Sequence, residues 1–470
     1  MMRYQSDKAL FTTEDVKLPS TEEATHFLAE HPEIQYVDLL LTDMNGIIRG
    51  KRVERNTLEK AFKSGIALPI SIYGMNIKGT PVEETGLGLE IGECDALCFP
   101  VPGTLSVEPW QKRPIAQLLM SMYENRETPF FADPRMILNR VLRQFKQLGI
   151  TPVSAFELEF YLIDRKSDNG MPQPPVSPTT GKRPTNTQVY SLDDLDEHAD
   201  LLTDIVDMAK LQGLPADTII AESAPGQFEI NLIHTDDAMA SCDNTVLLKR
   251  VIKQVAHAHQ LDTTFMAKPY ADQAGNGMHV HISLIDSDGN NVFAASDNGE
   301  PNDTLRWALG GMLSMLPEYM AILCPNVNSY RRFSPEFYVP SSPTWGFENR
   351  TTALRIPAGE PASTRIEHRV AGTDANPYLM MAALLASIQY GIENRIEPPE
   401  AIEGNAYTQS QPSLPNNLRD ALRELKTSET MASSLGRDFI DVYVTSKEKE
   451  LEEFERTISP LEYDWYLHTV

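Results

Sequence analysis

Glutamate and histidine side chains recur two residues apart in short apolar segments of this chain. Glu157 and Glu159 alternate with Phe and Leu in AFELEFYL. His279 and His281 alternate with apolar residues in GNGMHVHISL. Because a β-strand repeats every two residues, each pair should emerge on one face of its strand. Glu and His on that face are potential metal ligands, whereas an ordinary half-buried strand carries mixed polar residues there.

Two further segments add carboxylates of the same kind. Glu222 and Glu229 flank the Ala-Pro-Gly turn in TIIAESAPGQFEINLI, so a β-hairpin would bring them near each other. Glu367 lies in RIEHR, between two arginines on the same strand face. Carboxylates held together raise each other's pKa unless cations neutralise them. Oxygen-rich sites with an occasional imidazole suit Mg²⁺ or Mn²⁺ rather than zinc.

Arginines accompany these acids at Arg350, Arg355, Arg365 and Arg369. The guanidinium fork binds phosphate and carboxylate groups through paired, charge-assisted hydrogen bonds. Each segment alone is equally well explained as a solvated sheet face, but five of them in one chain indicate a site. Acids, arginines and the lack of a Ser or Cys nucleophile paired with a base favour phosphoryl transfer.

Strands and helices that would hold these residues can be predicted in outline. IQYVDLLLTDMNGIIRGKRV, from residue 34, is typical of a hairpin around an Asn-Gly turn. FADPRMILNRVLRQFKQL predicts an amphipathic helix, with Asp133 as N-cap and Gly149 at its end. The predicted domains are a frayed end with a short helix at 1–33, an N-terminal domain at 34–124 and a catalytic domain at 125–470.

The rest of the chain is predicted more coarsely. Helices are expected at 194–212 and 378–393, with two charged helices near the end, and 165–190 should form a surface loop. The four cysteines are scattered and are expected to be buried free thiols, not a zinc site. The first residues do not resemble a signal peptide, and the apolar stretch at 379–388 is too short to span a membrane, so a cytoplasmic protein is expected.

Net charge bears on the choice of partner. The formal net charge of the 470 residues is −25 at pH 7. A nucleic acid needs a basic surface, so it is not an expected partner. An acidic protein is compatible with a cationic substrate.

The motifs, in their order, resemble the glutamine synthetase superfamily over nearly the whole chain from about residue 34. They are ELE at 157–159, ESAPGQFE at 222–229, GNGMHVHIS at 275–283, NSYRRF at 328–333, NRTTALRIP at 349–357 and RIEHRVAGTDANPYL at 365–379. The resemblance implies an α+β fold, with a small β-grasp-like N-terminal domain and a large catalytic domain containing an antiparallel active-site sheet. It also implies a homo-oligomer, a dodecamer of two stacked hexameric rings with active sites between subunits.

The resemblance also implies roles for individual residues, with ATP and glutamate as substrates and two or three Mg²⁺ or Mn²⁺ ions per site. The metal beside glutamate would be held by Glu159, Glu222 and Glu229, and the metal bridging the ATP phosphates by Glu157, His279 and Glu367. Glutamate and the transferred phosphoryl group would be bound by Gly275, Arg332 and Arg369, with Arg350 on the phosphates. The nucleotide would contact His234, His281, Ser283, Arg355 and Arg365. In similar enzymes ATP phosphorylates the γ-carboxylate, and an amine then attacks γ-glutamyl phosphate.

Two departures from the family pattern concern the amine. Tyr73 and Tyr338 stand where ammonia-using members carry acids that bind ammonium, although Glu336 lies close to the second position. These losses favour a larger amine, and the local sequence resembles the members that ligate putrescine and other polyamines. Ordinary glutamine synthesis from ammonia, ligation of ethanolamine, an alkylamine or an anilide, and a non-catalytic structural relative are the alternatives.

Overall fold

A computed structural model of the chain describes residues 19–166, 170–186, 188–295 and 300–470. The predicted frayed end, up to residue 18, lies outside them. The helices are α1 (Thr21–Glu30), α2 (Leu58–Ser64), α3 (Pro134–Gln147), α4 (Leu192–Glu197), α5 (Ala199–Leu211), α6 (Ala238–Ala258), α7 (Asp303–Leu323), α8 (Pro377–Asn394), α9 (Ala406–Gln409), α10 (Leu418–Thr427), α11 (Glu429–Leu435), α12 (Arg437–Arg456) and α13 (Pro460–Tyr466).

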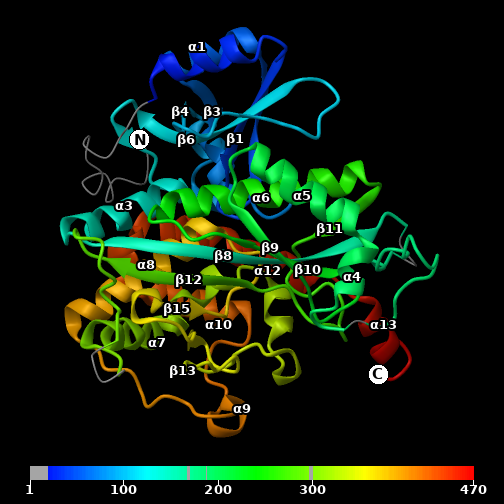
Figure 1. Cartoon of the computed structure of the whole chain (residues 1–470), viewed down its shortest axis with the longest axis vertical. Coiled ribbons are helices and arrows are strands. Elements are labelled where there is room, and N and C mark those ends of the chain that lie inside the picture. The colour runs from blue at the N-terminus through cyan, green and yellow to red at the C-terminus, as the bar shows by residue number, and fades with distance from the viewer. Residues whose placement is uncertain (1–18, 167–169, 187, 296–299) are drawn as a thin grey trace.

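The strands of the described residues form two sheets. The N-terminal sheet contains β1 (Tyr36–Thr42), β2 (Ile48–Glu54), β3 (Ile66–Pro69), β4 (Asp95–Pro100), β5 (Ser106–Val107), β6 (Ile115–Asn125) and β7 (Thr128–Pro129). The catalytic sheet contains β8 (Thr151–Asp164), β9 (Ala216–Ala221), β10 (Gln227–Leu232), β11 (Leu261–Thr264), β12 (Met278–Ile285), β13 (Trp345–Phe347), β14 (Leu354–Ile356) and β15 (Ile366–His368). Figure 1 shows the N-terminal sheet at one end of the long axis and β8 and β12 crossing the larger part.

The predicted hairpin and the predicted first long helix are both confirmed. β1 and β2 pair antiparallel on either side of the Asn-Gly turn. Asp133 caps α3 by accepting hydrogen bonds from the backbone N–H groups of Arg135 at 2.9 Å and Met136 at 3.3 Å. Gly149 follows the helix with φ +68°, a left-handed conformation that glycine adopts without strain. The boundary proposed near residue 125 stays a prediction; the N-terminal sheet continues through β7.

Other predictions need correction. The helix expected at 194–212 is two helices, because Ser191 caps α4 and the backbone at His198, φ −123° and ψ 24°, interrupts the helical path. The C-terminal segment forms α10 to α13, not two helices. Cys94 is exposed, whereas the other three cysteines are buried free thiols as predicted.

The catalytic sheet follows the order β13-β14-β15-β12-β8-β10-β9, and β11 also pairs with β8. Its central strands pair antiparallel, as the α+β prediction required. Alternate residues of β12 are buried, with Met278, Val280, Ile282 and Leu284 facing the core and the histidines on the other face. Behind the sheet, α8 is buried over most of its length and packs against α3, α6 and α7. This buried helical layer contacts the sheet through α3 and α6, which pack against β8.

Candidate active site

The register of the catalytic sheet brings the predicted metal ligands together. β8 lies between β10 and β12, with Glu159 opposite Glu229 and Glu157 opposite His279. On the far side of β12, His281 lies opposite Glu367 of β15. Directly opposed side chains have Cβ atoms about 4.5–5.5 Å apart. Neighbouring strands thus concentrate carboxylates and imidazoles on one face.

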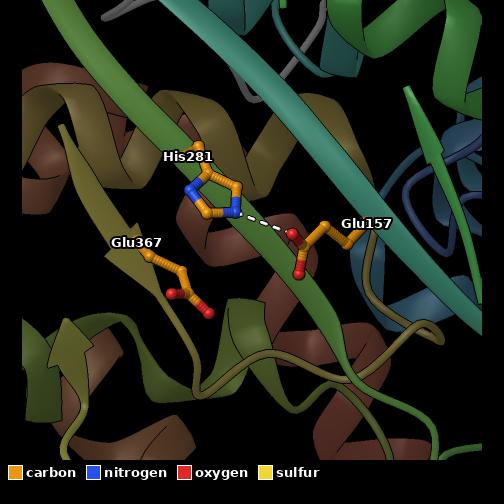
Figure 2. A group of neighbouring side chains, drawn as sticks. All are labelled: Glu157, His281 and Glu367. Atoms are coloured by element: carbon orange, nitrogen blue, oxygen red, sulfur yellow. Dashed lines mark hydrogen bonds and ion pairs between the residues drawn. The ribbon is translucent and has the colours of Figure 1, made fainter. Parts of the chain in front are cut away.

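Ligand atoms within 4.8 Å of one another form three groups among the described residues. They are Glu159–Glu222–Glu229, Glu157–Glu229–His279 and Glu157–His281–Glu367. The first is the set predicted for the metal beside glutamate. The other two differ from the second predicted set, because both histidines reach Glu157: His279 Nδ1 lies 3.2 Å and His281 Nε2 2.8 Å from its carboxylate oxygens. Figure 2 shows His281 and Glu157 joined in this way, with Glu367 nearby.

In the first group, burial and like charge outweigh the nearby arginines. Burial and the nearby Glu222 raise the pKa of Glu159 to about 8. Burial, together with Glu157 and Glu159, raises the pKa of Glu229 well above its ordinary value. Such shifts mark carboxylates whose ionised form is unfavourable until a cation joins them. The donor set and its charge therefore fit a divalent metal.

Glu157 and Glu367 are in the opposite electrostatic state. Burial opposes ionisation of Glu367, but Arg369, His279 and His281 together outweigh it and lower the pKa of Glu367 to about 2. Arg355 Nη1 lies 2.6 Å from one oxygen of Glu367, and Arg369 pairs with the other. At Glu157, hydrogen bonds from both histidines overcome burial and lower the pKa. This side of the cluster is already ionised and held in place.

Three arginines that line the smaller cavity have buried N–H donors without a hydrogen-bond partner among the described residues. Arg332 is 2% exposed and donates Nη1–H to the Val370 carbonyl at 2.9 Å. Among the described residues, the Nε–H groups of Arg332, Arg355 and Arg369 have no hydrogen-bond partner. Buried unpaired donors are uncommon in folded proteins, so they suit an anionic ligand.

Two cavities meet at this face. One, of about 660 Å³, is lined by all six predicted metal ligands and by Gly275, Arg332, Arg369 and Tyr338. The other, of about 1330 Å³, is lined by all six predicted nucleotide residues: His234, His281, Ser283, Arg350, Arg355 and Arg365. Glu157, Asn231, Arg350 and Arg355 line both. The larger cavity therefore adjoins the predicted metal ligands.

Tyr73 was predicted to contact the amine, and the structure contradicts this. Its side chain has no exposed surface and stacks on Phe130, with ring centroids 5.5 Å apart. Its hydroxyl donates to the buried carboxylate of Asp133 at 2.8 Å. Asp133 also caps α3 and accepts from the Met122 N–H at 2.7 Å. Tyr73, in the 3-10 helix Ile70–Gly74, therefore links this segment to the start of α3, and its buried side chain is not accessible to substrate.

Tyr73→Phe should consequently lower stability without changing amine use. The variant leaves buried Asp133 with one donor fewer, which should lower the free energy of unfolding by about 1–3 kcal/mol. Thermal unfolding and steady-state kinetics with varied amine test this. Tyr36→Phe, at a half-buried ring of β1, is the control. An altered amine KM at unchanged stability would restore a substrate role for Tyr73.

The flap after NSYRRF contains the two other residues predicted to contact the amine, Tyr338 and Glu336. Tyr338 lines the smaller cavity, and its backbone is left-handed at φ +55°. Glu336 is exposed and does not line that cavity. Phe337 packs beneath Lys268, whose ammonium lies 3.8 Å from the ring centroid. The flap thus presents the ring of Tyr338, and not the carboxylate of Glu336, to the smaller cavity.

Residues that sequence reasoning missed also line the smaller cavity. Gln227 Nε2 donates to the Gly275 carbonyl at 3.1 Å and lies 3.4 Å from Glu159. Gln227 is two residues before Glu229, so the two-residue periodicity of a strand could have predicted that both lie on one face. Val189 and Tyr190 enter from the end of the loop at 165–190. The composition of this segment predicts only a surface loop, and its sequence has no strand periodicity that would predict a place in the cavity.

The cluster, its arginines and the joined cavities define an enzyme class that handles phosphate groups with divalent metals. The chain belongs to the glutamine synthetase family. The family pattern described as "Glutamine synthetase, catalytic domain" matches residues 131–466. Enzymes of this family use ATP and divalent metals.

Similar proteins extend the match beyond that domain. The chain is 47% identical over 448 residues to γ-glutamylputrescine synthetase PuuA of Escherichia coli (strain K12), covering 95% of this chain and 94% of that one. It is 31% identical to glutamate–isopropylamine ligase of a Pseudomonas species, over 94% of this chain and 97% of that one. The solved GmaS/ADP complex superposes with a TM-score of 0.82 at 28% identity, covering 95% of this chain and all of that chain.

Among the described residues, no helix has both the length and the apolar character needed to cross a membrane.

Proposed function

We propose that this protein ligates the γ-carboxylate of glutamate to putrescine or another polyamine, using ATP and forming γ-glutamyl phosphate. One observation carries the choice of amine. Every acid among the described residues lining the smaller cavity belongs to the metal-ligand groups, so none is left over to bind ammonium. Aromatic side chains, Tyr190 and Tyr338, stand there instead. The similarity to PuuA of Escherichia coli supports the same choice.

The metal ligands would hold two or three Mg²⁺ or Mn²⁺ ions. Glu159, Glu222 and Glu229 supply one set; Glu157, His279, His281 and Glu367 supply the ligands nearer the nucleotide. When bound, such ions neutralise the carboxylates and withdraw charge from the phosphoryl oxygens. No Cys or Ser nucleophile is needed, because glutamate itself becomes the phosphorylated intermediate.

The glutamate side of the reaction rests on Gly275 and Arg332. A Cβ atom on Gly275 would lie 2.6 Å from both the Ala267 carbonyl oxygen and Arg332 Cγ, so glycine permits this close packing. Its backbone then borders the cavity beside the guanidinium of Arg332. Together they would bind and orient glutamate with its γ-carboxylate toward the metal-ligand groups.

The phosphoryl side rests on Arg350 and Arg369. Arg350 lines both cavities, and Arg369 is anchored by Glu367. Charge moves onto phosphoryl oxygens as the γ-carboxylate oxygen attacks ATP and ADP leaves. The amine nitrogen then attacks the acyl carbon, the C–O bond to phosphate breaks, and the nitrogen releases its extra proton. Fixed guanidinium groups stabilise the charge that develops in both steps.

Amine selection tests this proposal directly. With ATP, Mg²⁺ and glutamate fixed, release of ADP should be measured against putrescine, ammonium, ethanolamine and isopropylamine at pH 7 to 9. We expect kcat/KM for putrescine to exceed that for ammonium by about 100-fold or more, equivalent to about 2.7 kcal/mol. A monoamine of equal length should be a poorer substrate than the diamine. Only the diamine carries a distal ammonium group that the ring faces can attract. Preference for ammonium throughout this range would establish ordinary glutamine synthesis instead.

Assembly and location complete the proposal. We propose a cytoplasmic homo-oligomer, a dodecamer of two stacked hexameric rings by resemblance to the family. Helix α13 supports self-association, because its large apolar side chains are exposed in the single chain: Leu461, Tyr463, Trp465 and Tyr466. Light scattering of the purified protein would measure the mass of the assembly.

A further inference from the structure

Helix α6 presents two lysines to a cavity that lies apart from the active site. Lys249 and Lys253 are four residues apart, so they share a helix face. Both line a cavity of about 470 Å³, together with Phe265 and the turn at Asn45–Ile47. Neither lysine lines the substrate or nucleotide cavity. The proposed reaction has no use for them.

The two ammonium groups converge on one aromatic ring. Lys249 Nζ lies 5.5 Å and Lys253 Nζ 5.6 Å from the ring centroid of Phe265. Lys249 also donates to the Thr373 carbonyl at 2.6 Å. The ring and the carbonyl attract the cations but carry no net charge. Two like charges are therefore held at one wall of the cavity without a full counter-charge.

Other groups hold the acids on the cavity wall, although Asp374 keeps its Oδ1 without a hydrogen-bond partner among the described residues. Asp374 Oδ2 accepts from Asn326 at 2.8 Å and from Ser329 at 2.6 Å. Glu450 accepts from the Ile77 N–H at 2.7 Å and pairs with Lys447 at 2.9 Å. Among the residues that the structure describes, Asp374 and Glu450 are the acids lining this cavity. Neither forms an ion pair with Lys249 or Lys253.

The electrostatic result is a pair of under-compensated cations. Burial and the charge of Lys253 lower the pKa of Lys249 to about 7, against a weaker opposing effect of Asp374. Partial desolvation also lowers the pKa of Lys253, although this residue keeps solvent contact. A cation removed from water regains stability when an anion enters beside it. The net charge of the chain is −25, so acids are in excess, and a lysine pair without an acidic partner is unexpected.

We propose that this cavity binds a small anion bearing a carboxylate or phosphate group, held between the ammonium groups of Lys249 and Lys253. Its size lies within the range of about 300–1,000 Å³ typical of small-molecule sites. The site lies behind the glutamate-binding segment. Thr373 donates its hydroxyl to the Phe265 carbonyl at 3.3 Å, and Asn276, beside Gly275, donates to the Met266 carbonyl at 2.9 Å.

Calorimetric titration of the full chain tests the site. Inorganic phosphate and succinate are titrated separately, with ADP, Mg²⁺ and glutamate present to occupy the active site. We expect one binding event for at least one probe in the parent protein. Lys253→Gln should weaken it at least tenfold, and because Lys253 is exposed the variant should fold normally. Lys210→Gln, at an exposed lysine of α5, is the matched control and should bind as the parent does.

Lys249→Met provides a second variant, with thermal unfolding as the check on its fold. Binding of phosphate alone or succinate alone identifies the source of the anionic group and supports the site. Parent-like affinity in Lys253→Gln overturns the proposal, as does failure of both probes to bind the parent. A change in assembly mass in Lys253→Gln without anion binding also overturns it, since a second copy of the chain would then cover the cavity. None of these readings depends on which amine the enzyme uses.

Discussion

Glu229→Gln should abolish synthesis while leaving the metal-free protein at least as stable as its parent. Glu229 is 5% exposed on β10, directly opposite Glu159. The amide keeps the shape of the side chain but removes a negative charge from a group of three carboxylates. We expect kcat to fall by about 10³-fold or more, equivalent to about 4 kcal/mol of transition-state stabilisation.

Stability should move the other way because folding forces this carboxyl out of water. Burial and the neighbouring acids raise the pKa of Glu229, so its ionised form is disfavoured in the folded state. A neutral amide avoids that penalty. Added Mn²⁺ should raise the thermal midpoint of the parent, since a ligand that binds only the folded state stabilises it. The same addition should have a much smaller effect on the variant.

Thermal unfolding with and without Mn²⁺, beside steady-state turnover, separates the two effects. Glu90→Gln, at an exposed position of the N-terminal domain, controls for loss of one charge and should behave as the parent in both measurements. Parent-like turnover by Glu229→Gln at saturating Mg²⁺ would show that the three-carboxylate group holds no catalytic metal.

Strand periodicity explains why the ligand residues could be predicted one segment at a time. Glu157 and Glu159 on β8, and His279 and His281 on β12, share a face because successive strand residues alternate sides. The Glu222–Glu229 hairpin could be predicted because its turn is local: the Glu222 N–H donates to the Gln227 carbonyl at 2.9 Å. Local rules suffice where partners are close in the chain.

Pairing between distant strands does not follow from such rules. Glu157 lies opposite His279, more than one hundred residues later, and only the folded sheet defines that register. The division of His279 and His281 between metal and nucleotide stays a prediction for the same reason. Both rings reach Glu157, so their alternation along β12 does not decide which one serves which ligand.

The family motif alone did not show that Tyr73 is a buried structural residue. Tyr73 was matched to an acid that binds ammonium, yet its hydroxyl satisfies the buried carboxylate of Asp133. A buried acid requires such a donor, and a sequence alone does not show which tyrosine supplies it. Tyr338, matched in the same way, does line the smaller cavity, and its contact with the amine stays a prediction. Burial separates two residues that the sequence presents as equivalent.

Arg332→Lys should cause the second large loss of activity, and the loss should appear in kcat/KM for glutamate. The guanidinium is buried, donates to the Val370 carbonyl at 2.9 Å, and keeps its Nε–H without a partner in the described part of the chain. Lysine retains the charge but has neither the planar fork nor the reach to hold a carboxylate at two points. We expect kcat/KM for glutamate to fall on the order of 10²–10³-fold, as when a fixed donor to a reacting anion is lost.

The position of Arg332 explains why ATP should be affected little. It lines the substrate cavity, beside Gly275, and does not line the nucleotide cavity. The KM for ATP should therefore stay within about threefold, a difference of less than 1 kcal/mol. Arg331→Lys is the matched control, because the adjacent arginine is exposed and should tolerate the same exchange. Initial rates with glutamate and ATP varied in turn give both constants. An equal rise in both, or no change in either, would remove Arg332 from the glutamate site.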